Sequence, residues 1–248
     1  AILVVESQSM AVRAYLGSVD LNDERRFGHV DMISAWRSPG STLKPFLYGM
    51  ALDDGLIHSE SLLQDVPRRY GDYRPGNFSM GFSGPVSASS ALALSLNLPA
   101  VQLLEAYGPK RFAAQLRMAG MPLMLPPLAE PNLSLILGGA GSRLEELVGG
   151  YAALARAGNS ARIRLQPQDP LVERRLLSPG AAWIIRRILS GQARPDRDPH
   201  AELVQRPQLA WKTGTSYGFR DAWSIGVGPR YLIGVWIGRP DGTPVPGQ

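Results

Sequence analysis

Cysteine is absent from this chain of 248 residues. Without it, disulfide bonds, catalysis by a thiolate and metal sites built on cysteine ligands are all excluded. The absence is compatible with an oxidising compartment.

Lysine is scarce as well. The chain has only Lys44, Lys110 and Lys212, so its net charge of +5 rests almost entirely on arginine. The arginines are scattered, often in pairs such as those at residues 68–69 and 174–175. A nucleic-acid-binding surface needs a basic stripe interleaved with aromatic side chains, and none is present. The composition therefore argues against a nucleic-acid partner.

Long apolar runs are also lacking. The chain begins with apolar residues from Ala1 to Val5, and Glu6 ends the run, which is too short for a signal peptide or a membrane span. We therefore expect either a cytosolic protein or a piece of a longer one. Hydrophobic residues make up 44% and charged residues 19%, as in ordinary soluble proteins, which predicts one large domain, with or without an inserted lobe.

Strand patterns lie at both ends of the chain. Residues 1–5 and 10–16 predict two strands around a short turn, and residues 209–213, 222–227 and 231–237 predict three more. The stretches between them are mostly helical. The sequence therefore predicts an α+β fold in which the two termini meet in one antiparallel sheet flanked by helices.

The predicted helices follow apolar spacings of three and four residues. They cover residues 40–53, 87–107 with an interruption at 98–99, 142–157 after a capping box at 142–145, and 178–189. Residues 60–86 are rich in Gly, Pro, Tyr and Arg and predict a long loop, which in a compact domain is more often functional than idle.

Ser41 and Lys44 are the first candidate catalytic pair. Three residues apart on a helix, the hydroxyl and the amine share one face within a turn of each other. The start at Pro39 and Gly40 places Ser41 at the helix N-terminus, where free N–H groups favour a developing oxyanion. Ser41 is thus a candidate nucleophile with Lys44 as its base.

Lysine is a poor base at its reference pKa of about 10.4, so we expect burial or a second cation near Lys44. Lys212 supplies that cation in the tripeptide Lys212-Thr213-Gly214, on a predicted strand. Gly214 has no side chain and lets a substrate approach the backbone closely.

Ser95 and Asn97 form the third motif, a hydroxyl and an amide two residues apart at a break in the helical pattern. Each motif alone is weak. Their order along the chain, S-x-x-K, S-x-N and K-T-G, resembles that of class A β-lactamases and penicillin-binding proteins.

The resemblance extends beyond these motifs and covers nearly the whole chain. Residues 35–48, 131–134, 138–141 and 211–216 resemble the transpeptidase domain of class A penicillin-binding proteins. The resemblance implies a β-lactamase/transpeptidase-like fold over residues 1–248, with an all-helical subdomain at about 56–160. It also implies a periplasmic domain cut from a membrane-anchored protein, whose N-terminal glycosyltransferase and anchor lie outside this chain.

The resemblance implies a role for each motif residue. Ser41 attacks the D-Ala-D-Ala end of a peptidoglycan stem peptide, D-Ala leaves, and an acyl-enzyme remains. Lys44 takes the serine proton, Ser95 relays a proton to the leaving amine, and Asn97 hydrogen-bonds the substrate amide. An amine from a neighbouring stem then accepts the acyl group.

The Lys-Thr-Gly strand is implied to bind the substrate. Lys212 holds the site positive, Thr213 and Thr215 bind the terminal carboxylate, and the backbone N–H groups of Ser41 and Thr215 form the oxyanion hole. The implied ligands are stem peptides and, as covalent inhibitors, β-lactams, with cell-wall synthesis proteins as further partners. No metal or organic cofactor is implied.

Two departures from the family pattern stand out. Leu96 occupies a position where many relatives carry a polar residue, which puts any substrate contact there in doubt. The chain also stops at residues 246–248, directly after the last predicted strand, where the family continues into a helix that packs on the sheet. We expect part of the usual fold to be absent.

The hypothesis of an α/β-hydrolase fails for two reasons. Residues 214–218 fit the G-x-S-x-G elbow of α/β-hydrolases around Ser216, but a strand is predicted after it and no histidine follows. We expect His29, His58 and His200 to be surface residues.

Three alternative functions stay open. A serine β-lactamase is favoured by Glu130, which precedes Pro131 about where those enzymes hold a deacylating glutamate, although we expect a solvated turn residue there. A D,D-carboxypeptidase and a non-enzymatic β-lactam receptor share the same motifs. The loop at 60–86, with Tyr70, Tyr73 and Arg74, either lines an acceptor groove or is structural.

Overall fold

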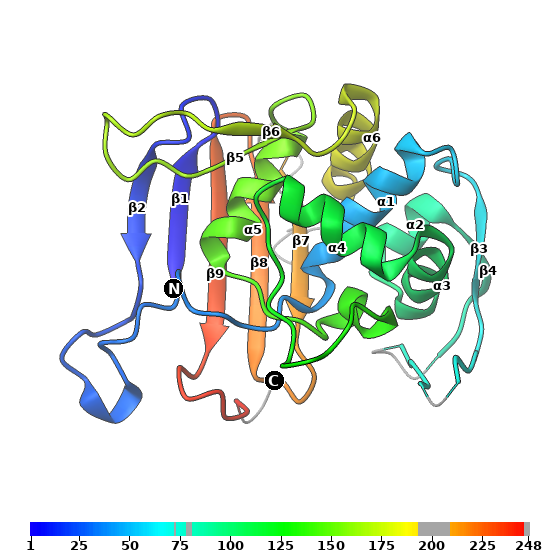
Figure 1. Cartoon of the computed structure of the whole chain (residues 1–248), viewed down its shortest axis with the longest axis horizontal. Coiled ribbons are helices and arrows are strands. Elements are labelled where there is room, and N and C mark those ends of the chain that lie inside the picture. Colours follow the sequence, from blue (N-terminus) through cyan, green and yellow to red (C-terminus); the bar gives the residue numbers. More distant parts are fainter. Residues whose placement is uncertain (72, 78–80, 193–208, 246–248) are drawn as a thin grey trace, which may run out of the picture.

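The structure is a computed structural model that describes residues 1–71, 73–77, 81–192 and 209–245. Its centre is a five-stranded antiparallel sheet of order β2-β1-β9-β8-β7 (Figure 1). The strands are β1 (Ile2–Glu6), β2 (Val12–Leu16), β7 (Ala210–Thr215), β8 (Asp221–Val227) and β9 (Tyr231–Gly238). All five strands were predicted from the sequence.

The two ends of the chain meet in this sheet, as predicted. Strand β1 lies between β2 and β9 and pairs with β9 in the register Ile2 to Val235 and Val4 to Ile233. The antiparallel sheet with helices on it confirms the predicted α+β class. Strand β7, which carries Lys212, forms the opposite edge of the sheet.

Six α-helices accompany the sheet in the part of the chain that the structure describes. They are α1 (Lys44–Asp53), α2 (Ala88–Ala93), α3 (Asn97–Tyr107), α4 (Pro109–Met118), α5 (Leu144–Tyr151) and α6 (Pro179–Ser190). Short 3-10 turns occur at Glu24–Arg26, Gly40–Leu43, Leu133–Leu137 and Ala152–Leu154. Helix α5 packs on β9, β1 and β8, and α6 packs between β7 and α1 (Figure 1).

The loop predicted over residues 60–86 is only partly a loop. It contains two short paired strands, β3 (Leu62–Asp65) and β4 (Gly84–Ser87), at the far edge of the helical side (Figure 1). Leu63 and Asp65 are both buried, which gives β3 the alternation of a strand. Four residues are too few for that alternation to stand out beside a Gly- and Pro-rich segment.

The interruption predicted at residues 98–99 lies earlier, at 94–96, between α2 and α3. Pro99 sits in the first turn of α3, where a missing N–H breaks no intrahelical bond. Proline was therefore the wrong marker for the break. Helix α4 was not predicted at all.

The capping box predicted at residues 142–145 does not form. Ser142 instead pairs through its backbone with Arg37, so α5 begins at Leu144 and has no side-chain cap. This helix also ends at Tyr151 and continues as a 3-10 turn, short of the predicted Ala157. The start of α6 is as predicted, because Ser178 accepts a hydrogen bond from the Ala181 N–H at 3.0 Å.

Two further strands, β5 (Asn159–Ala161) and β6 (Glu173–Arg175), form a small separate antiparallel pair. The helical subdomain at about 56–160 stays a prediction, and that range holds α2 to α5 together with β3 and β4. Within the described residues, no helix is long and apolar enough to cross a membrane.

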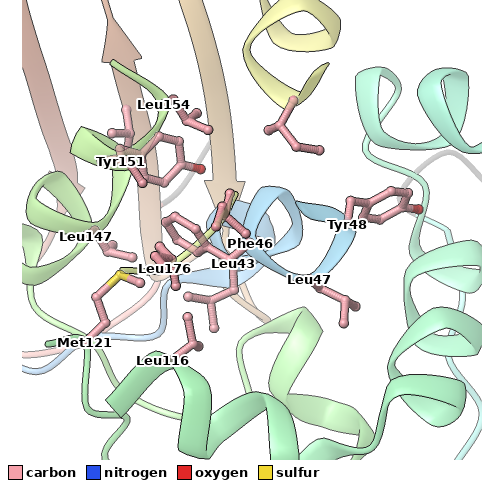
Figure 2. Close-up of a cluster of buried hydrophobic side chains, with 14 of the residues drawn as sticks. Leu43, Phe46, Leu47, Tyr48, Leu116, Met121, Leu147, Tyr151, Leu154 and Leu176 are labelled. Carbon is pink, nitrogen blue, oxygen red and sulfur yellow. The ribbon is translucent and has the colours of Figure 1, made fainter. Parts of the chain in front are cut away.

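The core joins the helices directly to the turn that carries Ser41. Figure 2 shows Phe46 of α1 facing Tyr151 of α5, with Met121 and Leu147 beside them. The two rings meet edge-on, with centroids 5.0 Å apart. The Tyr151 hydroxyl donates to the Thr42 carbonyl at 2.7 Å in a fully buried setting. The same side chain thus packs the core and fixes the backbone next to Ser41.

Candidate active site

Ser41 lies in the 3-10 turn Gly40–Leu43 that leads into α1. The prediction of an N-terminal helical position is confirmed, although the first turn is 3-10 and not α. The Thr42 N–H and hydroxyl both donate to the Pro39 carbonyl, at 3.2 and 2.9 Å, and close the turn. Ser41 is half-buried, whereas Lys44, three residues on, is 0% exposed.

Strand β7 presses against this turn, and two glycines permit the contact. A Cβ on Gly214 would lie 2.4 Å from the Pro39 carbonyl oxygen, and a Cβ on Gly40 would lie 2.4 Å from the Thr215 oxygen. Gly40 also has a φ of +52°, which favours glycine. The close approach that was expected of Gly214 is therefore made to the serine turn itself.

The side chains of β7 alternate between two environments. Lys212 and Gly214 are buried, and Thr213 and Thr215 are exposed. The two threonine hydroxyls therefore share the open face of the strand, beside the turn that carries Ser41. The Trp223 indole on β8 donates to the Ser38 carbonyl at 2.7 Å and ties the turn to the sheet from a second strand.

Lys44 binds the segment between α2 and α3. Its Nζ donates to the carbonyl oxygens of Ser95 and Leu96 at 2.7 and 3.1 Å, and to Asn97 Oδ1 at 2.7 Å. Ser95 has a φ of +58°, an unusual value for a residue with a side chain. The break in the helix thus turns two carbonyls toward one buried ammonium.

Lys212 binds the same segment from the sheet. Its Nζ donates to Ser95 Oγ at 2.8 Å and to the Thr213 carbonyl at 3.0 Å. The structure therefore brings the three motifs together, as the sequence predicted. Ser41 Oγ makes no hydrogen bond within the described residues.

Both lysines have lowered pKa values. Burial lowers the pKa of Lys44 well below its usual range, and the charge of Lys212 lowers it further. Burial alone lowers the pKa of Lys212 to about 8. Burial disfavours the charged form of an amine, so the neutral form becomes accessible near physiological pH. The second cation expected near Lys44 is Lys212.

Sequence reasoning missed the residues that hold Asn97 from its other side. The Asn97 side-chain N–H donates to the Gly76 carbonyl at 2.7 Å, and the Asn97 backbone N–H donates to Asn77 Oδ1 at 3.0 Å. Both partners come from the segment predicted as a loop. Its length was a signal of function, but nothing in the sequence marked Asn77 individually.

The competing motifs do not form sites. Ser216 is buried in the β7–β8 turn, where its Oγ accepts a hydrogen bond from the Asp221 N–H at 2.9 Å, and a strand follows it. Glu130 forms an exposed ion pair with Lys110 at 2.7 Å, its side chain 72% exposed. His29 and His58 are exposed as predicted, and His200 lies outside the described residues. Among the described residues, no group of three or more metal-ligating side chains occurs.

Comparison with curated relatives points to one family. Penicillin-binding protein 1C of Escherichia coli (strain K12) is 66% identical over 248 residues, which are 100% of this chain and 32% of that protein. Penicillin-binding protein 1A of Neisseria gonorrhoeae is 28% identical over 263 residues, covering 96% of this chain and 32% of that protein. The chain thus spans about a third of the length of these relatives.

Solved structures share the fold. PonA1 of Mycobacterium tuberculosis in complex with penicillin V superposes with a TM-score of 0.80 at 21% identity, covering 99% of this chain and 70% of that one. Penicillin-binding protein 1A of Haemophilus influenzae also gives 0.80, at 20% identity, covering 100% of this chain and 44% of that one. The family profile described as "Penicillin binding protein transpeptidase domain" matches residues 1–124, half of the sequence. With its fold, its motif order and that profile in agreement, this chain belongs to the penicillin-binding protein transpeptidase family.

Proposed function

We propose that the chain is the D,D-transpeptidase domain of a cell-wall synthesis protein, acylated on Ser41 by D-Ala-D-Ala stem peptides and by β-lactams. The observation that carries this proposal is the buried pair of amines around Ser95, with Lys44 one helical turn from Ser41. A serine hydroxyl needs a base to become a nucleophile, and a lysine becomes one when burial lowers its pKa. A periplasmic location and a parent protein with a glycosyltransferase belong to the same proposal.

The hydrogen bonds of Lys44 define its part in the first step. As an ammonium it uses all three hydrogens, on the oxygens of residues 95, 96 and 97. Once neutral it has two hydrogens and one lone pair, so one of these directions is released. The lone pair then accepts the Ser41 proton while Ser41 Oγ forms the bond to the D-Ala carbonyl carbon.

The remaining groups complete the reaction. Ser95, whose hydroxyl accepts from Lys212, passes a proton to the departing D-Ala nitrogen as the peptide bond breaks. Thr213 and Thr215, on the open face of β7, bind the terminal carboxylate, and the N–H groups of Ser41 and Thr215 receive the developing oxyanion. Asn97 keeps its second side-chain N–H for the substrate amide. An acceptor amine then attacks the acyl carbonyl carbon, the bond to Ser41 Oγ breaks, and the proton that the amine loses returns to Ser41.

The experiment that tests the proposal is intact-mass measurement after incubation with a β-lactam. We expect wild type to gain the mass of the drug and Ser41→Ala to gain none. Ser216→Ala is the matched control, because it removes the serine of the competing motif, and it should still gain the adduct. A wild type without an adduct, or an equal adduct on Ser41→Ala, would refute the proposal.

Two further outcomes separate the related activities. Rapid release of hydrolysed drug from the adduct would indicate a β-lactamase, a reading that the exposed ion pair of Glu130 disfavours. A stable adduct without any product from a D-Ala-D-Ala peptide, with or without an added amine, would indicate a receptor. Release of D-Ala without transfer to the amine would indicate a carboxypeptidase.

A further inference from the structure

The segment between β3 and β4 reaches the start of α3 through one side chain, that of Asn77. Asn77 Oδ1 accepts the Asn97 backbone N–H at 3.0 Å. This N–H belongs to the first turn of α3, where no intrahelical acceptor exists. The neighbouring Gly76 carbonyl accepts the Asn97 side-chain N–H at 2.7 Å. Two consecutive residues of the segment therefore hold both the backbone and the side chain of Asn97.

Asn77 is itself anchored by a buried carboxylate. Its Nδ2 donates to Asp65 Oδ1 at 2.7 Å and to the Gly81 carbonyl at 3.1 Å. Asp65 is 0% exposed, and its second oxygen accepts the Ser83 N–H at 2.8 Å. Within the described residues Asp65 has no ion pair, so these hydrogen bonds compensate its burial. A bond from a neutral donor to a buried carboxylate is strong and fixes which way the Asn77 amide faces.

The orientation of the Asn97 amide follows from the Gly76 carbonyl, which belongs to the residue directly before the anchored Asn77. With its nitrogen on Gly76, the Asn97 amide must present Oδ1 to Lys44 Nζ, which it meets at 2.7 Å. A reversed amide would place hydrogens against the ammonium and lose both bonds. Asp65, Asn77, Asn97 and Lys44 thus form one continuous chain of contacts from the end of β3 to the base of the proposed reaction.

We propose that Asn77, anchored by Asp65, is a positioning residue. It fixes the Asn97 backbone and the adjoining Gly76 carbonyl, and through them the orientation of the Asn97 amide that holds Lys44 Nζ for proton transfer from Ser41. The inference rests on the proposed function and adds a residue outside the three motifs. Among the described residues Asn77 makes no hydrogen bond to Ser41 or to β7, so its role is through Asn97.

Two effects are expected when Asn77 is replaced by alanine. Acylation should slow by about tenfold, the value of one hydrogen bond of roughly 1.4 kcal/mol. When the Asn97 amide loses its fixed orientation, Lys44 loses Oδ1 as an acceptor for its ammonium form, which lowers the pKa of Lys44. The half-maximal point on the acidic side of the rate profile should then move to lower pH. The charged group that acts on Lys44 is Lys212, and the substitution leaves it unchanged. A purely structural loss would lower the rate without moving this point.

The measurement is the second-order rate of acylation by a fluorescent penicillin, followed across the neutral pH range together with thermal melting. Gln102→Ala is the matched control. Gln102 Oε1 on α3 accepts the Gln64 N–H of β3 at 3.0 Å, so its loss removes a different bond to α3, from β3 itself, without touching Asn97. We expect Gln102→Ala to keep the wild-type rate and profile.

A reciprocal exchange keeps the test decisive if Asn77→Ala folds poorly. Asn77→Asp retains the acceptor for the Asn97 N–H but faces the Asp65 carboxylate with a like charge. Adding Asp65→Asn restores one donor and one acceptor between the two positions. The double variant should acylate faster than Asn77→Asp alone.

The outcomes separate this inference from the proposed function. If wild type forms no adduct, the proposed function fails. If wild type is acylated and Asn77→Ala matches it in rate and pH profile, only the positioning role of Asn77 is overturned. The role is also overturned if Gln102→Ala slows acylation as much as Asn77→Ala, or if the exchange recovers nothing over the single Asn77→Asp.

Discussion

The contact between β7 and the serine turn leaves no room for a side chain at Gly214. A Cβ there would lie 2.4 Å from the Pro39 oxygen and 2.7 Å from Thr42 Cγ2, where real Cβ contacts stay beyond 3.0 Å. Gly214→Ala must therefore move the strand and the turn apart by about 0.6 Å, since a misfit of this size cannot be absorbed in place. The Pro39 carbonyl cannot turn away without losing its two bonds from Thr42.

This displacement acts on the groups of the proposed reaction. Misplacing a reacting group by about 1 Å costs roughly a hundredfold in rate, so a shift of this size should slow acylation by about 10- to 100-fold. Overpacking should also lower the free energy of unfolding by about 1–3 kcal/mol. The rate is measured with a fluorescent penicillin and the stability by chemical denaturation, at a temperature where both proteins are folded.

Gly226 on the adjacent strand β8 provides the control. A Cβ there would meet Leu209 Cδ1 at 3.4 Å, an ordinary contact. Gly226→Ala should therefore acylate within about twofold of wild type, because surplus methyl groups without a clash have small effects. If Gly214→Ala is acylated at the wild-type rate, the contact between β7 and the serine turn does not set the reactive geometry.

Three further predictions follow from the same contacts. Gly40→Ala should slow acylation as Gly214→Ala does and also destabilise the fold, because its φ of +52° and the Thr215 oxygen at 2.4 Å both oppose a Cβ; denaturation and acylation rates check this. Between about pH 8 and its ordinary pKa of 10.5, folded Lys212 has lost the proton that the unfolded chain keeps, so stability should rise with pH in wild type relative to Lys212→Met. The free energy of unfolding is measured by denaturation across that range, and an equal change with pH in the two proteins would contradict this prediction. Phe46→Ala should cost about 3–5 kcal/mol on denaturation, because the ring is fully buried, and a cost under 1 kcal/mol would contradict the packing in Figure 2.

The sequence was sufficient for the sheet and for the motifs. The strands at both ends are short runs of apolar, β-branched and aromatic residues bounded by turn residues, and β1 pairs with β9 as that arrangement required. Ser41, Lys44 and Lys212 could be named as candidates because a lysine base needs desolvation or a nearby cation, and the structure buries Lys44 beside Lys212. These inferences depend on side-chain chemistry and spacing, which a sequence states directly.

Long-range contacts of single residues could not be read in the same way. The capping box failed because Ser142 is held by Arg37, more than a hundred positions away. The partners of Asn97 come from a segment 20 residues earlier, where an asparagine in a loop has many possible uses. Local propensity does not report such contacts, and tertiary packing decides them.

The break between α2 and α3 links a local backbone conformation to a long-range contact. Ser95 adopts a left-handed conformation that costs about 1–2 kcal/mol, and an uninterrupted helix would avoid that cost. An uninterrupted helix would also keep the carbonyls of Ser95 and Leu96 for its own N–H groups. Released from the helix, both oxygens bind Lys44, and they make the burial of an ammonium tolerable where no carboxylate among the described residues pairs with it. A carboxylate in their place would raise the pKa of Lys44 and keep it protonated, whereas neutral carbonyls hold the amine in place and leave its proton easier to remove. The strain at Ser95 is thus part of how the fold buries the lysine that we propose as the base.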